Sequence, residues 1–154
     1  PISFAFPREK IPLPINKTQT LAIIIPGDNT TYIYTQEADY YAGYNQSLFA
    51  KTCKKGGWDC MRHYEILACH CVPWFTDIAQ CPDKICVTLP KHLLMYTNDL
   101  LSQYKYDDFL NGELRARYQH LNELIFSHFV DNCTTDTLAK SVIDTAKNSM
   151  PSTI

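Results

Sequence analysis

The stretch that decides the fold lies between residues 47 and 75 and reads SLFAKTCKKGGWDCMRHYEILACHCVPWF. Its apolar runs and its Lys-Lys-Gly-Gly break predict a strand at 47–53, a loop at 54–57, a helix from about 60 to 69 and a strand at 72–75. Asp59 stands just before the helix and is a favourable N-cap residue. A strand–loop–helix–strand order is typical of a parallel α/β unit.

The rest of the chain continues the alternation of strands and helices. Short β-rich runs predict further strands at 21–25, 31–34 and 85–89, and helical spacing predicts helices near 36–45, 91–103, 107–129 and 134–148. In the third of these helices an apolar stripe recurs every three or four residues, at Leu110, Leu114, Tyr118, Leu121, Ile125 and Phe129. We therefore predict an α/β, Rossmann-like layered domain with a mainly parallel sheet and a helical C-terminal third.

Three parts of the chain differ in composition. Four of the nine prolines fall within residues 1–20, which predicts an extended lead-in or linker. Residues 21–106 form the expected Rossmann-like core, and residues 107–154 are expected to supply C-terminal helices that pack on the same domain. Because the chain starts at Pro1 and lacks the pattern of a signal peptide, we expect it to be a piece of a longer protein.

Composition excludes several classes of protein. The 154 residues are 45% hydrophobic and 19% charged, which suits one domain with a buried core. The net charge of −2 gives no support for a nucleic-acid partner or an anionic membrane. The longest apolar run, Leu21–Ile25, is far too short for a membrane span, which needs about 20 residues.

Cysteines and glycosylation motifs point to different compartments. The seven cysteines, an odd number, favour a reducing, cytoplasmic setting. The four Asn-x-Ser/Thr motifs favour the Golgi or another secretory lumen, and they begin at Asn16, Asn29, Asn45 and Asn132. Cys69, His70 and Cys71 with Cys81 and Cys86 offer metal-ligating groups, but small buried hydrophobic residues are the simpler interpretation of the cysteines.

The loop at 54–57 and the helix after it form a candidate anion site. A loop between the carboxyl end of a parallel strand and a helix start presents free N–H groups and the positive end of the helix dipole. The candidate ligand-binding residues are Lys54, Lys55, Gly56, Gly57, Asp59, Arg62 and Glu65. Cationic side chains suit a phosphate, flexible glycines let the backbone approach a ligand, and a carboxylate suits sugar hydroxyls. The alternatives are a solvated lysine loop, a plain turn and a surface Arg62–Glu65 ion pair.

The motif from Arg62 to Pro73, Arg-His-Tyr-Glu-Ile-Leu-Ala-Cys-His-Cys-Val-Pro, resembles the exostosin-like glycosyltransferases of family 47 and the donor-binding half of GT-B enzymes. The flanking segments Ser47-Leu48-Phe49, Lys54–Asp59, Cys81-Pro82 and Leu89-Pro90-Lys91 extend the resemblance over residues 47–93. Two positions depart from the family pattern. His70 stands where relatives usually have glycine, and Trp58 stands where retaining GT-B enzymes often carry a second glutamate, which favours an inverting reaction.

The resemblance implies a nucleotide-sugar donor, a glycan or glycoconjugate acceptor hydroxyl and a metal-independent transfer without a cofactor. It places Glu65 at the nucleotide ribose, and it places Arg62 and the preceding loop near the diphosphate. It also implies a missing N-terminal, acceptor-binding half, because a complete GT-B enzyme has two Rossmann-like halves. No catalytic base can be assigned, since the family base generally comes from the other half and His63, His92, His120 and His128 have no evident partner.

The alternative function is a non-catalytic Rossmann-like module that binds a glycan or a protein. Its contact surface would be a run of tyrosines, which are favoured at interfaces, at Tyr32, Tyr34, Tyr40, Tyr41 and Tyr44. The same tyrosines also suit ordinary core and helix packing. A cysteine-ligated metal protein is the third interpretation.

Overall fold

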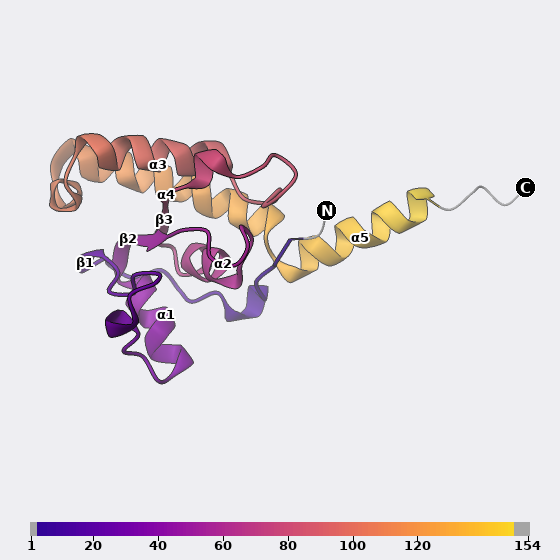
Figure 1. The fold of residues 1–154 in the computed structure, drawn as a ribbon, viewed down its shortest axis with the longest axis horizontal. Helices are drawn as coiled ribbons and strands as arrows, with labels where there is room; N and C mark the ends of the chain where they lie inside the picture. Colours follow the sequence, from indigo (N-terminus) through magenta and orange to yellow (C-terminus); the bar gives the residue numbers. More distant parts are fainter. Residues whose placement is uncertain (1–2, 150–154) are drawn as a thin grey trace, which may run out of the picture.

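The computed structural model describes residues 3–149 and shows an α/β domain built on a three-stranded parallel sheet (Figure 1). The strands lie in the order β1-β2-β3, which is also their order along the chain. Their bounds are β1 Gln19–Leu21, β2 Ser47–Thr52 and β3 Val72–Phe75. The predicted class, α/β with a parallel sheet and a helical C-terminal region, is confirmed.

Helices connect the strands and make up the C-terminal region. The α-helices are α1 Glu37–Asn45, α2 Met61–Ala68, α3 Lys91–Gln103, α4 Gly112–Asn132 and α5 Thr135–Ser149. Short 3-10 helices lie between them, at η1 Arg8–Lys10, η2 Asn29–Thr31, η3 Ile78–Gln80 and η4 Tyr106–Leu110. Helix α1 joins β1 to β2 and α2 joins β2 to β3, as the sequence predicted for the central unit.

The central strand β2 is buried on both faces. The ring of Phe49 lies 5.1 Å from that of Phe109 and 5.3 Å from that of Tyr118, so this face of the strand packs against η4 and α4. The neighbouring Ala50 belongs to a second buried cluster with Ile66 of α2 and Tyr44 of α1. Successive side chains of a strand point to opposite faces, so Phe49 faces η4 and α4 while Ala50 faces α1 and α2. Helix α2 also packs directly against α4 through the main core.

The apolar stripe of the long C-terminal helix is largely confirmed. Tyr118, Leu121, Ile125 and Phe129 are buried in the main core. The helix predicted over 107–129 is nevertheless divided, because Gly112 has a φ of +68° and a right-handed helix does not continue through that conformation. Leu110 therefore lies in the separate η4, where it is 40% exposed.

Two predicted strands, at 31–34 and 85–89, are wrong. Asp28 accepts a hydrogen bond from the Thr30 N–H, and the Thr31 hydroxyl donates to the Asp28 carbonyl, so the chain closes into η2. At 85–89 the Ile85 N–H donates to the Pro82 carbonyl, which makes a turn. Within residues 3–149 neither segment pairs with a neighbouring strand, and an isolated run of β-formers is not a strand.

The remaining strand, predicted at 21–25, is displaced to Gln19–Leu21. The Ala22 N–H still donates to the Phe49 carbonyl, and Leu21 pairs with Phe49, but the pairing with β2 ends there. Ile23 is 43% exposed, so the apolar run leaves the sheet before the Pro26-Gly27 turn. Hydrogen bonding to β2, which hydropathy cannot report, decides where this strand lies.

The predicted lead-in at 1–20 is packed against the domain along the part that the structure describes. Phe6 is fully buried and forms a β-bridge with Thr134. The Lys17 ammonium donates to the Asn45 carbonyl at 2.7 Å and to the Cys69 carbonyl at 3.3 Å. One lysine therefore satisfies carbonyls at the C-terminal ends of both α1 and α2, where a positive charge is favoured.

Helix α4 packs on the domain, but α5 does not. Within residues 135–149 no residue is buried, and the helix projects from the body (Figure 1). No helix in the described part of the chain is long and apolar enough to span a membrane.

Candidate functional site

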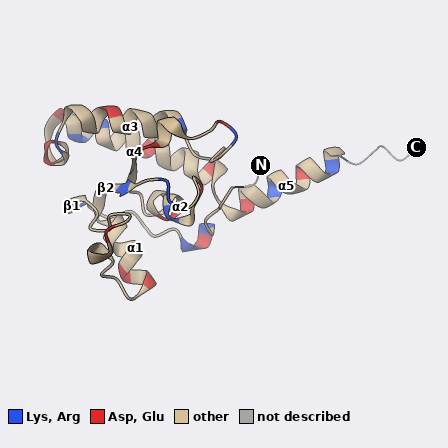
Figure 2. Cartoon of the chain, viewed as in Figure 1, with Lys and Arg blue, Asp and Glu red and all other residues tan. Residues whose placement is uncertain are grey.

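Lys55, Arg62 and Tyr32 come together where the loops leave the carboxyl ends of β1 and β2. The Arg62 guanidinium carbon lies 6.0 Å from the centre of the Tyr32 ring. The Lys55 ammonium lies 3.5 Å from the place that a Cβ on Gly27 would occupy. Figure 2 shows the basic residues in the loop that joins β2 to α2. In open parallel sheets, ligands bind outside this edge.

The Tyr32 hydroxyl lies in a locally positive environment. It accepts a hydrogen bond from the Gly27 N–H at 3.0 Å. The pKa of Tyr32 lies below its usual value, mainly because of this N–H donor and also because the positive charges of Arg62 and Lys55 are near. The same charges would favour a bound anion at this place.

Arg62 lacks a carboxylate partner within residues 3–149. None of the ion pairs found among these residues involves it, so the predicted alternative of a surface Arg62–Glu65 pair is not formed. Its side chain is half-buried, and its Nε is buried without a hydrogen-bond partner. Burial by itself lowers the pKa of Arg62, but the nearby Tyr44 and Tyr40 hydroxyls outweigh it and the net pKa is raised. The group stays charged, and a charge in such a place is normally paired.

Glu65 lies on the same helix but is bound to a tyrosine. The Tyr40 hydroxyl donates to its Oε2 at 2.9 Å, and the Tyr44 hydroxyl donates to the Tyr40 oxygen at 3.2 Å. Burial raises the pKa of Glu65 despite these contacts. This series of two hydrogen bonds leaves Oε1 of Glu65 free to accept from a hydroxyl of a ligand.

The glycine-bearing loop satisfies its own first N–H groups. The Lys54 N–H donates to both Asp77 carboxylate oxygens, at 3.1 and 3.2 Å, and the Lys55 N–H donates to the Gly57 carbonyl. The Lys54 ammonium lies over the Trp58 ring, 5.3 Å from its centre. A Cβ on Gly56 would meet nothing within 4 Å, so the fold itself does not require glycine there. Lys55 is therefore better placed for a ligand than Lys54.

Asp59 does not cap the helix, contrary to the prediction. Cys60 is the N-cap residue of α2, and it makes no side-chain capping bond. The Asp59 carboxylate instead accepts from the Tyr64 hydroxyl at 2.8 Å and from the Phe4 N–H at 3.3 Å. A buried tyrosine hydroxyl needs an acceptor, and this need turns Asp59 towards the N-terminal segment instead of the predicted site.

His63 is a packed histidine. Its Nε2 lies 2.9 Å from the Trp58 carbonyl and its Nδ1 lies 3.0 Å from the Thr52 hydroxyl, while its ring stacks on Phe75. The carbonyl can only accept, so Nε2 carries the proton and Nδ1 accepts from Thr52. The Cys60 sulfur is 3.3 Å from the same Nε2, which is therefore protonated and cannot act as its base. Burial lowers the pKa of His63 and raises that of Cys60.

The metal-binding interpretation finds no support among residues 3–149, where no three His, Cys, Asp or Glu side chains gather as ligands. Cys69 and Cys71 are buried in the core, as small hydrophobic residues often are. His70 points elsewhere, since its ring stacks 3.9 Å from that of Phe126.

The run of tyrosines is mostly turned inward. Tyr44 is buried, and the hydroxyls of Tyr40 and Tyr41 donate to Glu65 and Glu37. Only Tyr32, which is 42% exposed, offers substantial contact area to a partner. The packing interpretation of the run is the one that the structure favours. The sequence pattern did not assign Tyr32 and Tyr40 to the candidate site, although the Tyr40–Tyr44 spacing indicates that both face one neighbour.

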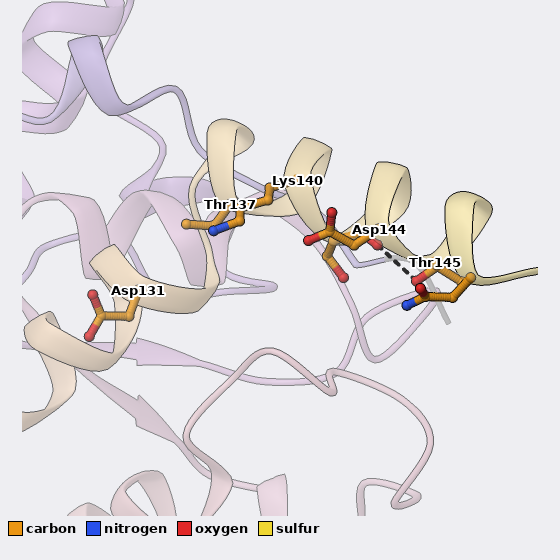
Figure 3. Close-up of a pocket in the computed structure, with 7 residues that line it drawn as sticks. Asp131, Thr137, Lys140, Asp144 and Thr145 are labelled. Carbon is orange, nitrogen blue, oxygen red and sulfur yellow. Dashed lines mark hydrogen bonds between the residues drawn. The ribbon is translucent and has the colours of Figure 1, made fainter.

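A separate hollow of about 430 Å³ lies between the end of α4 and the polar face of α5 (Figure 3). It is lined by Asp131, Thr137, Lys140, Ser141, Asp144, Thr145 and Asn148. It contains none of the predicted site residues, and its two carboxylates make it unfavourable for a phosphorylated ligand.

Comparisons with models of protein families, with curated proteins and with solved structures found no match to this chain. The resemblance to exostosin-like glycosyltransferases, and every role that it implies, therefore stays a prediction.

Proposed function

We propose that this domain binds a nucleotide sugar at the edge formed by Lys55, Arg62 and Glu65, as the donor-binding part of a glycosyltransferase. The observation that carries the proposal is the half-buried Arg62 guanidinium, which has no carboxylate partner in the described chain and has a buried Nε without an acceptor. A diphosphate beside the guanidinium would supply the missing opposite charge.

The chemistry of glycosyl transfer suits these groups. Departure of the nucleoside diphosphate places negative charge on its terminal phosphate, and positioned cations in a low-dielectric site stabilise that charge. Arg62 offers a fork of donors, and Lys55 offers a mobile point charge from the adjacent loop. The free Oε1 of Glu65 would accept from a ribose hydroxyl while Tyr40 holds the other oxygen. The acceptor and its base would come from residues outside this site.

The test is the thermal shift produced by UDP, by GDP and by inorganic pyrophosphate. A ligand at about 100 times its Kd adds roughly 2.7 kcal/mol to the free energy of unfolding. For a chain of this size that corresponds to a rise in Tm of about 5–11 °C. Arg62→Gln should abolish the shift with all three ligands, whereas Lys84→Gln, an exposed lysine outside the site, should leave it intact.

Glu65→Gln tests separately how the ribose and the diphosphate of the ligand are bound. It should weaken the shift with the nucleotides and leave the shift with pyrophosphate unchanged, because only the nucleotides carry ribose hydroxyls. An absence of any shift at millimolar nucleotide, or a shift that survives in Arg62→Gln, would refute the proposal.

A further inference from the structure

Cys81 and Cys86 flank an exposed turn in the segment between β3 and α3. The Ile85 N–H donates to the Pro82 carbonyl at 3.0 Å and closes the turn. Residues 82–85 are exposed, whereas both cysteines are buried. A closed turn brings the residues on either side of it together. The Cys81 sulfur accordingly lies 3.7 Å from the carbonyl oxygen of Ile85, the residue that is bonded to Cys86.

The two thiols are in contact inside the protein. The side chains of Cys81 and Cys86 are hydrogen-bonded to each other, and both belong to the main buried cluster. A disulfide forms without large backbone movement only when the two side chains already point towards each other. The contact between the thiols shows that these two side chains do.

The backbone around the pair is held from several sides. The Lys91 ammonium donates to the Pro82 carbonyl at 2.8 Å and to the Asp83 carbonyl at 3.3 Å. The Leu89 N–H donates to the Cys86 carbonyl and closes a second turn. Cys86 has a φ of +51°, which is uncommon for residues other than glycine. These contacts keep the two thiols together in the reduced protein.

We propose that Cys81 and Cys86 form a reversible disulfide by exchange with a small disulfide such as oxidised glutathione. Cys81 is 8% exposed and Cys86 is 1% exposed, so the Cys81 thiolate attacks first and releases one molecule of reduced glutathione. The Cys86 thiolate then attacks the Cys81 sulfur of the mixed disulfide and releases the second. One S–S bond breaks and one forms, and the two protons and two electrons lost by the cysteines pass to the two glutathione thiols.

Burial makes the exchange slow while the turn is closed. It raises the pKa of the Cys86 thiol, because a buried thiolate loses its hydration, and the negative charge of Asp59 adds to the effect. Exchange therefore proceeds when the exposed turn opens or while the chain folds. The state of the pair consequently depends on the compartment, as a dithiol where glutathione is reduced and as a disulfide in an oxidising lumen.

The test is incubation of the full chain in buffers with different ratios of reduced to oxidised glutathione. Free thiols are then blocked with N-ethylmaleimide, and the protein is digested with trypsin and chymotrypsin. Cleavage after Phe75, Lys84 and Lys91 yields the peptides 76–84 and 85–91, each with one cysteine. Mass spectrometry should find these two peptides joined at oxidising ratios and separate at reducing ratios.

Two variants show whether the bond is specific and fits the native fold. Cys81→Ser should remove the joined peptides, whereas Cys53→Ser, which changes a half-buried cysteine elsewhere, should keep them. Oxidation should raise the Tm of the wild type and of Cys53→Ser by roughly 4–9 °C, because the bond closes a short loop and restricts the unfolded chain. It should leave the Tm of Cys81→Ser unchanged.

The absence of the joined peptides at every glutathione ratio would overturn the proposal. So would a bond from Cys86 to a different cysteine, or a bond that forms only after unfolding in urea. An oxidised wild type that melts at or below the temperature of the reduced protein would show that the bond does not fit the native turn, and it would overturn the proposal as well.

Discussion

We predict that the variant with glycine at position 70 has a free energy of unfolding about 1 kcal/mol higher than the variant with alanine there. This is the reverse of the order inside a helix. His70 has a φ of +53° and stands just after the end of α2. Its N–H donates to the Leu67 carbonyl at 3.0 Å, and the Cys71 N–H donates to the Ile66 carbonyl at 3.2 Å. These two bonds form a Schellman motif, in which the left-handed residue is usually glycine. A side chain with a Cβ costs roughly 1–2 kcal/mol in that conformation.

The histidine side chain offsets this cost through two contacts. Its ring centre lies 3.9 Å from that of Phe126, a stacking contact of about 0.5–1.5 kcal/mol. Its Nε2 lies 3.1 Å from the Pro12 carbonyl, a hydrogen bond with a net contribution of about 0.5–1.5 kcal/mol. His70→Ala should therefore lose about 1–3 kcal/mol, because it removes both contacts and keeps the strain. His70→Gly removes the same contacts but relieves the strain, so it should lose about 0–2 kcal/mol.

Urea unfolding of the two variants measures the difference, and thermal unfolding should show it as about 2–4 °C in Tm. Ala116→Gly in the exposed interior of α4 is the control, and there glycine should be the less stable residue by about 1 kcal/mol. If His70→Ala proves as stable as His70→Gly or more stable, the left-handed conformation at this residue is wrong, and with it the explanation of the helix end.

Two further predictions follow from buried positions. Gly43→Ala should destabilise the fold by up to about 2 kcal/mol in urea unfolding, because the new Cβ would lie 2.8 Å from the Tyr34 ring and this clash outweighs the roughly 1 kcal/mol that alanine gains over glycine inside a helix. Gly56→Ala should be neutral, and a stabilised Gly43→Ala would contradict the close packing of α1. Acidification should lower the urea midpoint, because burial lowers the pKa of His63 in the folded state and the unfolded chain, with a pKa near 6.5, takes up the proton more readily. This contribution is complete above pH 6.5 and is lost as the pH falls through the lowered folded-state pKa, so a midpoint that stays flat on acidification would contradict a buried, neutral His63.

His70 has the left-handed backbone conformation that glycine adopts most readily. The predicted resemblance to exostosin-like enzymes also expects glycine at this position. Here histidine occupies that conformation and is held by Phe126 and the Pro12 carbonyl. It does not alter the face of α2 that carries Arg62.

The sequence by itself determined the central unit from 47 to 75, because its strands, loop and helix depend on local signals: apolar runs, adjacent glycines and helical spacing. It also determined the parallel α/β class and the buried stripe of α4. It could not decide whether the run at 85–89 is a strand, because a strand requires a partner that hydropathy does not reveal.

Only the tertiary structure decided which predicted site residues come together. Arg62 and Tyr32 are thirty positions apart and meet because the loops after β1 and β2 leave the same edge of the sheet. Asp59 is only three positions from Arg62, yet it is drawn away by the hydroxyl of Tyr64. Residue type and spacing describe what a side chain can bind, whereas the hydrogen bonds that compete for it depend on neighbours that only folding brings together.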